Sequence, residues 1–256
     1  MQLRVLGCSG GLGGRQQQTT ALLVDRDILI DAGTGVGDLG IDEMAAIDHV
    51  FLTHAHVDHI AALPLLIDSV GERRQQPLTI HALPAVIDCL RQHIFNWAIW
   101  PDFSVVPHTA APYMTFCPLS VGETVSLDGR SMTALPVEHT VPAVGYHIAS
   151  DQGSLVFSGD TGPCDAFWQV VNDIDKLRHL IIECAFPDRQ RPLAELSKHL
   201  CPAMLREELA KFRQGGCAIH VTHLKPGDVT TTMHEIETQL AAYAPKMLQP
   251  GQVIVL

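Results

Sequence analysis

The stretch FLTHAHVDHI, residues 51–60, carries three histidines and one aspartate within six consecutive positions. It begins with a short apolar run, which is typical of the end of a buried strand. Alternate side chains of an extended chain point to the same side, so we expect His54, His56 and Asp58 to converge on one cation. His59 breaks this alternation, and a turn into a helix directly after it would aim its imidazole at a second cation. A solvated polar loop is the alternative, but four donor residues at this density favour a metal site.

Three further donor residues each follow a strand-like segment. His139 comes after MTALPVE, Asp160 after SLVFSG and His223 after CAIHVT. A single residue of this kind is usually structural, but loops that follow strands gather functional groups on one edge of a sheet. Their common position predicts that they help to hold two divalent cations, with Zn²⁺ favoured and Mn²⁺ or Fe²⁺ as alternatives.

Composition limits the classes of function. The chain has 256 residues, of which 46% are apolar, and this is enough for a sizeable core. Its formal net charge of -11 disfavours large nucleic acids as partners, because such binding depends on clustered Lys and Arg. A small anionic substrate remains compatible with this charge, since bound cations can reverse the local field.

The cysteines and the hydropathy pattern indicate the compartment. The seven cysteines are odd in number and never spaced as Cys-x-x-Cys, which fits neither a disulfide framework nor a zinc-thiolate site. The chain begins without a long apolar segment, and it contains no run of about 20 apolar residues. We therefore expect a reducing, cytoplasmic location and no membrane partner.

Strand-like and helix-like segments follow one another along most of the chain. Strands are expected at 2–6, 20–24, 27–31, 48–53, 78–81, 131–137, 143–149, 154–159, 178–184, 217–221 and 252–256. Helices are expected at 60–70, 83–95, 165–175, 202–213 and 229–242. This mixture predicts sheets covered by helices, in a single layered α/β domain over residues 1–256. Residues 96–120 lack clear periodicity, and we expect an inserted loop or lid there.

The ordered motifs resemble a known family. THAHVDH, the lone His139, FSGDTG and VTHLKP follow one another as in the metallo-β-lactamase superfamily. The resemblance spans nearly the whole chain and implies an αββα sandwich, in which two mixed sheets are flanked by helices and a dinuclear site lies along one edge. It assigns one ion to His54, His56 and His139, the other to Asp58, His59 and His223, and a bridging role to Asp160.

A narrower likeness concerns the class II cyclic-nucleotide phosphodiesterases, in the branch that also contains tRNase Z. It depends on the segments VLGCSGG, NWAIWPDF, HTVPAVGYHI, SGDTGPCDAFW, LIIECAFPD and SKHLCP. The chain departs from the class II pattern at Val57 and in IAALP, where Leu and a Gly-containing turn are usual. This departure leaves the ligands in place and bears on the substrate. The basic arm with which tRNase Z grips tRNA has no counterpart here.

The resemblance implies a phosphodiesterase that hydrolyses 3′,5′-cyclic AMP or GMP to nucleoside 5′-monophosphates by a metal-bridged hydroxide. We expect Asp58 both to bind the second ion and to orient the nucleophile. His199 in SKHLCP is the expected proton donor to the leaving group. By analogy with the family, Glu183 in IIECAF is expected to hydrogen-bond the other ring nitrogen of His199 and keep it protonated. A structural role for Glu183 and a surface position for His199 are the alternative.

Other functions stay open at this point. The same scaffold could act on RNA ends, on 2′,3′-cyclic phosphates or on another phosphodiester, or carry iron as an oxidoreductase, or bind metal without turnover. The partner expected is a small cyclic nucleotide, and a homodimer is kept open. GCSGGLGG, residues 7–14, is predicted to form a tight turn near the metal edge. Trp97, Trp100 and Phe103 could stack on a base or belong to the core.

Overall fold

The computed structural model describes residues 1–14 and 17–256. Its central strands bury side chains on both of their faces. In β2 (Ala21–Val24), Leu22 and Val24 belong to a core between two sheets, whereas Leu23 packs towards helices on the outer side. Strands that are covered on both sides read as continuous apolar runs, because successive side chains point to opposite faces. The same division between an inner and an outer core recurs in the second sheet.

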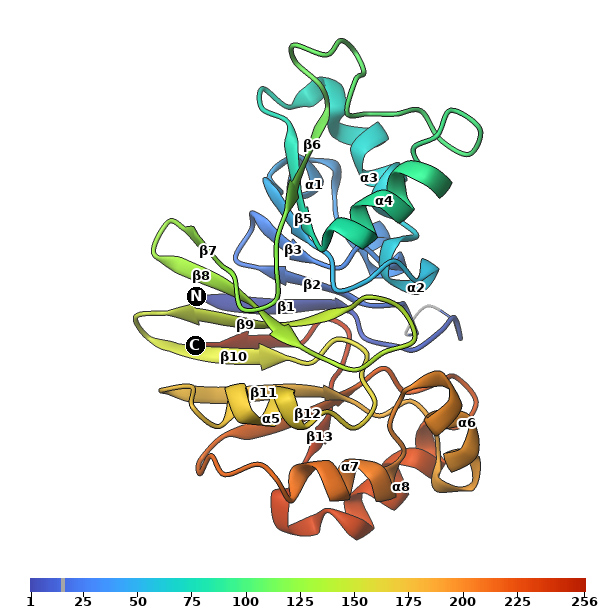
Figure 1. Ribbon diagram of the computed structural model, residues 1–256, viewed down its shortest axis with the longest axis vertical. Coiled ribbons are helices and arrows are strands. Elements are labelled where there is room, and N and C mark those ends of the chain that lie inside the picture. Colours follow the sequence, from blue (N-terminus) through green and yellow to red (C-terminus); the bar gives the residue numbers. More distant parts are fainter. Residues whose placement is uncertain (15–16) are drawn as a thin grey trace.

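Two seven-stranded mixed sheets result, stacked face to face (Figure 1). The first sheet has the order β14 (Val253–Val255), β1 (Gln2–Gly7), β2, β3 (Ile28–Ile30), β4 (His49–Phe51), β5 (Leu78–Ala82) and β6 (Met114–Pro118). The second has the order β13 (Lys246–Met247), β12 (Ala218–Thr222), β11 (Leu177–Glu183), β10 (Gly153–Phe157), β9 (Val144–Ser150), β8 (Arg130–Pro136) and β7 (Thr124–Leu127). Each sheet has three antiparallel pairings on one side and three parallel pairings on the other, and in the order given the parallel pairings come last in the first sheet and first in the second.

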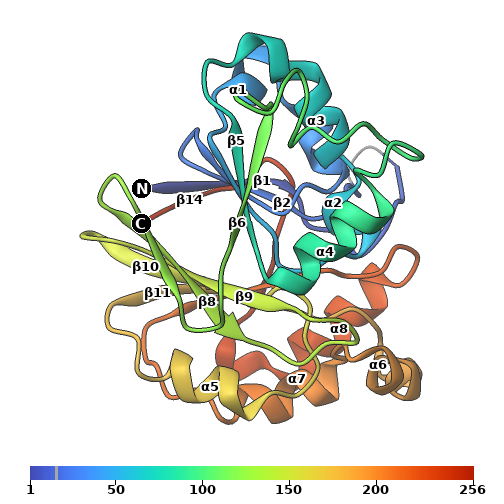
Figure 2. The ribbon, with the colours of Figure 1, turned by 45° about the horizontal axis from the view of Figure 1, so that its top comes forward.

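Helices cover the outer faces of both sheets, as Figures 1 and 2 show. The first half of the chain supplies α1 (Ile41–Ala45), α2 (Val57–Ile60), α3 (Leu63–Val70) and α4 (Pro84–His93). The second half supplies α5 (Asp165–Val171), α6 (Arg191–Ser197), α7 (Pro202–Leu209) and α8 (Val229–Gln239). Short 3₁₀ turns lie at Thr34–Asp38, Gly71–Arg73, Asp188–Gln190 and Ala241–Tyr243. The expected αββα arrangement is thus confirmed.

Several short elements escape the sequence patterns. Strands β6, β7 and β13 and helices α1 and α6 lie outside the predicted segments. Strand β6 falls within the stretch 96–120, whose earlier part, 96–113, has no helix or strand. Within that part Phe103 is buried at 3% exposure and Trp100 packs on the same core, whereas Trp97 is 67% exposed. Phe103 is therefore a core residue and cannot stack on a base.

Several strands end at one edge of the sandwich. Strands β4, β10 and β12 each lead directly into a loop that carries predicted site residues, and β11 ends on Glu183. Ligand sites in α/β sheets lie outside the carboxyl ends of parallel strands. No helix in residues 1–14 and 17–256 is both long and apolar enough to cross a membrane.

Two pairs of imidazoles, each with one buried and one half-buried ring, bridge neighbouring parallel strands. His81 Nε2 lies 3.1 Å from His49 Nδ1, and His220 Nε2 lies 3.1 Å from His179 Nδ1. Burial, reinforced by the charge of the neighbouring imidazole, lowers the pKa of both His81 and His220 to about 4. Neutral imidazoles are therefore part of the folded state.

We predict that the fold loses stability as the pH falls from about 6.5 to about 4. Over this range the unfolded chain binds protons at His81 and His220 that the folded chain does not, so the free energy of unfolding decreases with decreasing pH. Urea unfolding in the presence of a chelator should show a weaker pH dependence for the double variant His81→Gln/His220→Gln than for the wild type. The exposed His93→Gln is the control, and equal pH dependence in all three proteins would contradict the prediction.

Candidate metal centre

The histidine-rich stretch leaves β4 as an extended segment and then enters α2. His56 precedes this helix in extended conformation, and α2 begins at Val57. The expectation that the helix starts near residue 60 was therefore wrong by one turn. Asp58 lies in the helix and not in an extended chain, so it turns away from His54 and His56 and joins His59 instead. A helical turn moves side chains by about 100° per residue, which separates the donors into two groups.

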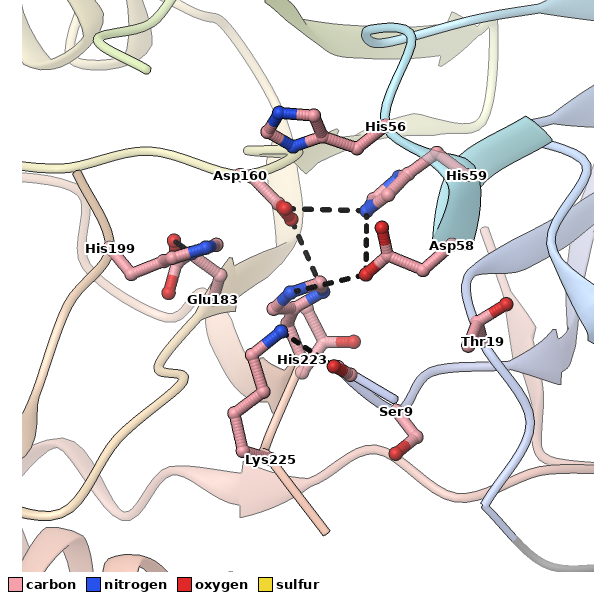
Figure 3. A network of polar contacts seen from close by, with 12 residues as sticks. Ser9, Thr19, His56, Asp58, His59, Asp160, Glu183, His199, His223 and Lys225 are labelled. Atoms are coloured by element: carbon pink, nitrogen blue, oxygen red, sulfur yellow. Dashed lines mark hydrogen bonds and ion pairs between the residues drawn. The ribbon is translucent and has the colours of Figure 1, made fainter. Parts of the chain in front are cut away.

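The structure brings all seven predicted ligands together. Within each of two groups, one ligand atom from every residue lies within 4.8 Å of the others: His54, His56, His139 and Asp160 form the first, and Asp58, His59 and His223 the second. Figure 3 shows the second group around the carboxylate of Asp160. These residues come from loops after β4, β8, β10 and β12 and from the first turn of α2. The grouping agrees with the division that the family resemblance implies.

Asp160 lies between the two groups and is nearly completely buried. Its Oδ2 atom is 3.6 Å from His54 Nε2. Figure 3 shows its other two contacts, in which Oδ2 is 3.3 Å from His59 Nε2 and Oδ1 is 3.2 Å from His223 Nδ1. Burial raises the pKa of this carboxyl, but its electrostatic interactions with the His223 and His59 rings outweigh burial and hold the pKa well below its ordinary value. Asp160 is thus an anion facing both groups.

Most of the imidazoles are held neutral. Burial is the main cause that lowers the pKa of His54, His56, His139 and His223, to about 4 in the case of His139. A neutral imidazole offers a lone pair, which is the state that binds a cation. Burial also lowers the pKa of His59, but the carboxylates Asp160 and Asp31 outweigh burial and raise it well above its ordinary value.

Several buried ring nitrogens of the site have no hydrogen-bond partner, which indicates whether a cation would fit there. Within the described residues, His59 Nε2 and both ring nitrogens of His223 are buried and make no hydrogen bond. Such groups cost about 1–3 kcal/mol each when left unpaired. They face the carboxylates of Asp58 and Asp160, at 3.2 to 4.0 Å. A divalent cation between these nitrogens and oxygens would satisfy both, so the residues present fit metal binding.

Asp31 supports the site from behind the His59 ring, and no sequence pattern predicted this role. This fully buried carboxylate accepts hydrogen bonds from the Thr53 amide at 2.8 Å and the Thr53 hydroxyl at 2.8 Å, and it lies 2.7 Å from His59 Nδ1. The contact fixes the His59 ring so that Nε2 points to Asp160. The available signal was an aspartate directly after the strand ILI, and its φ of 56° marks a sharp turn there.

Glu183 and His199 form a second buried carboxylate–imidazole pair. Glu183 Oε1 lies 2.6 Å from His199 Nδ1, and its two oxygens accept the backbone amides of Thr161, at 3.0 Å, and Leu200, at 3.2 Å. Burial lowers the pKa of His199, but the charge of Glu183 outweighs burial and raises it. The His199 ring stacks on that of His223, with centroids 5.1 Å apart. His199 is therefore beside the metal groups and not a surface residue.

The glycine-rich turn 7–14 packs against the loop that carries His223. His223 donates its amide to the Cys8 carbonyl at 2.8 Å, and Gly10 donates its amide to the Leu224 carbonyl at 3.1 Å. A Cβ atom at Gly10 would lie 2.4 Å from the His223 carbonyl oxygen and 2.9 Å from its ring, so only glycine fits. This turn holds His223 with a φ of 64°. The glycine-rich segment thus lies at the metal edge, as predicted.

Asp31→Asn is predicted to weaken metal binding by about 10- to 100-fold, because the amide no longer accepts the His59 Nδ1 proton as a charged partner does. Competition with a chromophoric chelator would measure the change, with circular dichroism as a check on folding. Asp48→Asn is the matched control, since the Asp48 carboxylate is 59% exposed and pairs with Arg74. Equal metal affinity of the Asp31 and Asp48 variants would rule out the supporting role.

Known proteins share both sequence and fold with this chain. It is 28% identical over 205 residues to a Yersinia pestis protein named "Probable 3',5'-cyclic-nucleotide phosphodiesterase", which covers 71% of this chain and 58% of that protein. It is 31% identical over 160 residues to a "Ribonuclease Z" of Halorubrum lacusprofundi, which covers 59% of this chain and 49% of the relative. The chain thus spans less than two thirds of the length of these relatives.

Solved structures and a family model extend the comparison to almost the whole chain. The crystal structure of unliganded yeast PDE1 matches with a TM-score of 0.81 at 18% identity, over 100% of this chain and 99% of that one. The metallo-beta-lactamase fold protein YhfI from Bacillus subtilis matches with a TM-score of 0.76 at 20% identity, over 99% and 98%. Residues 26–244 match the family model described as "Beta-lactamase superfamily domain". The chain therefore belongs to the metallo-β-lactamase superfamily, as its ordered His and Asp motifs predicted.

Proposed function

We propose that this protein is a metal-dependent phosphodiesterase that holds two divalent cations and hydrolyses 3′,5′-cyclic nucleotides to nucleoside 5′-monophosphates. The observation that carries the proposal is the meeting of two ligand groups at Asp160, with the Glu183–His199 pair directly beside them. One ion is assigned to His54, His56 and His139, the other to Asp58, His59 and His223, and Asp160 to both. The imidazole-rich donor set favours Zn²⁺, with Mn²⁺ or Fe²⁺ as alternatives.

Bound cations supply two things that phosphodiester hydrolysis needs, since they acidify water and neutralise charge on the phosphate oxygens. The protein supplies orientation. Asp58 has a side chain that is 27% exposed, whereas the imidazoles of its group are buried, so it is the donor that faces the open side. We propose that Asp58 accepts a hydrogen bond from the attacking water. This contact directs a lone pair of the water oxygen at phosphorus.

We propose that His199 donates the proton that the leaving ribose oxygen requires. Its Nδ1 atom is engaged by Glu183, so Nε2 carries the transferable proton. The raised pKa of His199 keeps the imidazole protonated nearer to neutral pH than an isolated histidine. Because Glu183 is fully buried and also holds the Thr161 amide, it ties the position of His199 to that of the Asp160 loop.

A positive group beside the ligands supports an anionic substrate. Lys225 follows His223 by two residues, and its Nζ atom donates to the Gly10 carbonyl at 2.6 Å (Figure 3). This contact holds an ammonium group at the metal edge of an otherwise acidic chain of net charge -11. Such an arrangement suits a small phosphate diester better than a long polynucleotide, which needs an extended basic surface.

A second candidate substrate is RNA. The relatives named ribonuclease Z, at 30 to 31% identity, favour this alternative. The 2′,3′-cyclic phosphates combine a small size with an RNA-derived structure, and they are included in the substrate panel described below.

His199→Ala is predicted to lower kcat by about 10²- to 10⁴-fold with little change in metal content, because it removes a general acid and no assigned ligand. Steady-state kinetics and metal analysis of the same preparation would measure both quantities. His234→Ala, an exposed residue on α8, is the control and should retain the wild-type rate. A substrate with a nitrophenolate leaving group should be much less affected by the substitution, because this leaving group needs no proton. Equal loss for both leaving groups would contradict the role of His199 as an acid.

A substrate panel tests the proposed function itself. The metal-loaded protein should hydrolyse cyclic AMP or cyclic GMP faster than a 2′,3′-cyclic nucleotide or a short RNA, and chelation should abolish the rate until Zn²⁺ or Mn²⁺ is restored. Preference for the RNA would transfer the assignment to RNA processing. Absence of any metal-dependent hydrolysis across the panel would overturn the proposed phosphodiesterase activity.

A further inference from the structure

A third group of potential ligands overlaps the two already described. One ligand atom each from Asp160, His199 and His223 lies within 4.8 Å of the others, and all three residues are buried. In the proposed function His199 is a proton donor and binds no metal.

The surroundings of His199 repeat those of the assigned ligand His59. His59 Nδ1 lies 2.7 Å from the Asp31 carboxylate, and His199 Nδ1 lies 2.6 Å from the Glu183 carboxylate. Both carboxylates are fully buried and are further held by backbone amides. A carboxylate on one ring nitrogen fixes the ring and increases the basicity of the other nitrogen, which is the arrangement found behind histidines that bind metals. By this criterion Nε2 of His199 is as well prepared for a cation as Nε2 of His59.

His223 contributes to the third group through the face that it turns towards Asp160. Its Nδ1 atom lies 3.2 Å from Asp160 Oδ1, while its Nε2 atom lies 3.8 Å from Asp58 Oδ2. A neutral imidazole has one lone pair, so His223 cannot serve two cations fully at the same time. A third cation would also be repelled by its neighbours. Binding to the third group must therefore be weaker than binding to the first two.

We propose that Asp160, His199 and His223 form a weaker, inhibitory site for an additional divalent cation such as Zn²⁺. A cation on Nε2 of His199 occupies the lone pair that would otherwise carry the proton to the leaving group. The inference depends on the proposed function for its inhibitory effect, while the binding of the additional ion does not. Excess metal thereby lowers the rate of hydrolysis without removing the two cations that support it.

Equilibrium dialysis against increasing free Zn²⁺ tests the binding. The wild type should take up a third equivalent at a higher concentration than the first two, and His199→Phe should bind two equivalents only. Exposed histidines can also bind Zn²⁺, so His93→Ala and His234→Ala serve as matched controls that should retain the third equivalent. A third equivalent that persists in His199→Phe, whatever the control variants bind, would overturn the proposal.

Two further measurements on the wild-type protein keep the test decisive if His199→Phe fails to fold. Anomalous diffraction from crystals soaked in excess Zn²⁺ should show a peak at bonding distance from His199 Nε2. The hydrolysis rate should decline over the same range of free Zn²⁺ in which the third equivalent binds. If the protein binds only two ions and keeps full activity at all zinc concentrations, the inhibitory site is overturned and the proposed function stands. If a third ion binds at His199 in a protein that hydrolyses no substrate, the additional binding site stands and the proposed function is overturned.

Discussion

The site depends on the compensation of buried charge at Asp160. A carboxylate at 2% exposure is costly unless positive groups or cations surround it. Here the imidazoles of His54, His59 and His223 approach it to within 3.6 Å. Within the described residues, His59 Nε2 and both ring nitrogens of His223 have no hydrogen-bond partner. The two carboxylates behind them, Asp31 and Glu183, fix the direction of the rings. The result is a set of donors that is already oriented, so little conformational freedom remains to be lost when a cation binds.

The sandwich makes this convergence possible because parallel strands of both sheets deliver their loops to one edge. Strand β4 delivers the histidine-rich stretch, and β10, β11 and β12 deliver Asp160, Glu183 and His223. The hydroxyl of Tyr146 in β9 donates to the Leu52 carbonyl at 2.8 Å, which ties the two sheets together just before the ligands begin. The strand ends and the Tyr146–Leu52 hydrogen bond between the sheets fix the positions of the two ligand groups relative to each other.

The packing of the glycine-rich turn against the His223 loop also fixes the position of the Lys225 ammonium group. The turn packs closely against the His223 loop, and the hydrogen bond from Lys225 to the Gly10 carbonyl joins the same two segments. Its consequence is an ammonium group held close to the ligands. A surface lysine without this contact would move freely and contribute little to the recognition of an anion.

The sequence by itself determined the strand pattern, the layered α/β class and the seven donor residues, because apolar runs and densely spaced histidines are local signals. It did not reveal strands β6, β7 and β13, which are short or partly exposed, nor the start of α2 at Val57. Only the tertiary structure placed Asp31 behind His59, since the two residues are 28 positions apart and their contact depends on the pairing of β3 with β4. The stacking of His199 on His223 is likewise a product of the fold, because no periodicity of the chain records which loops meet at a sheet edge.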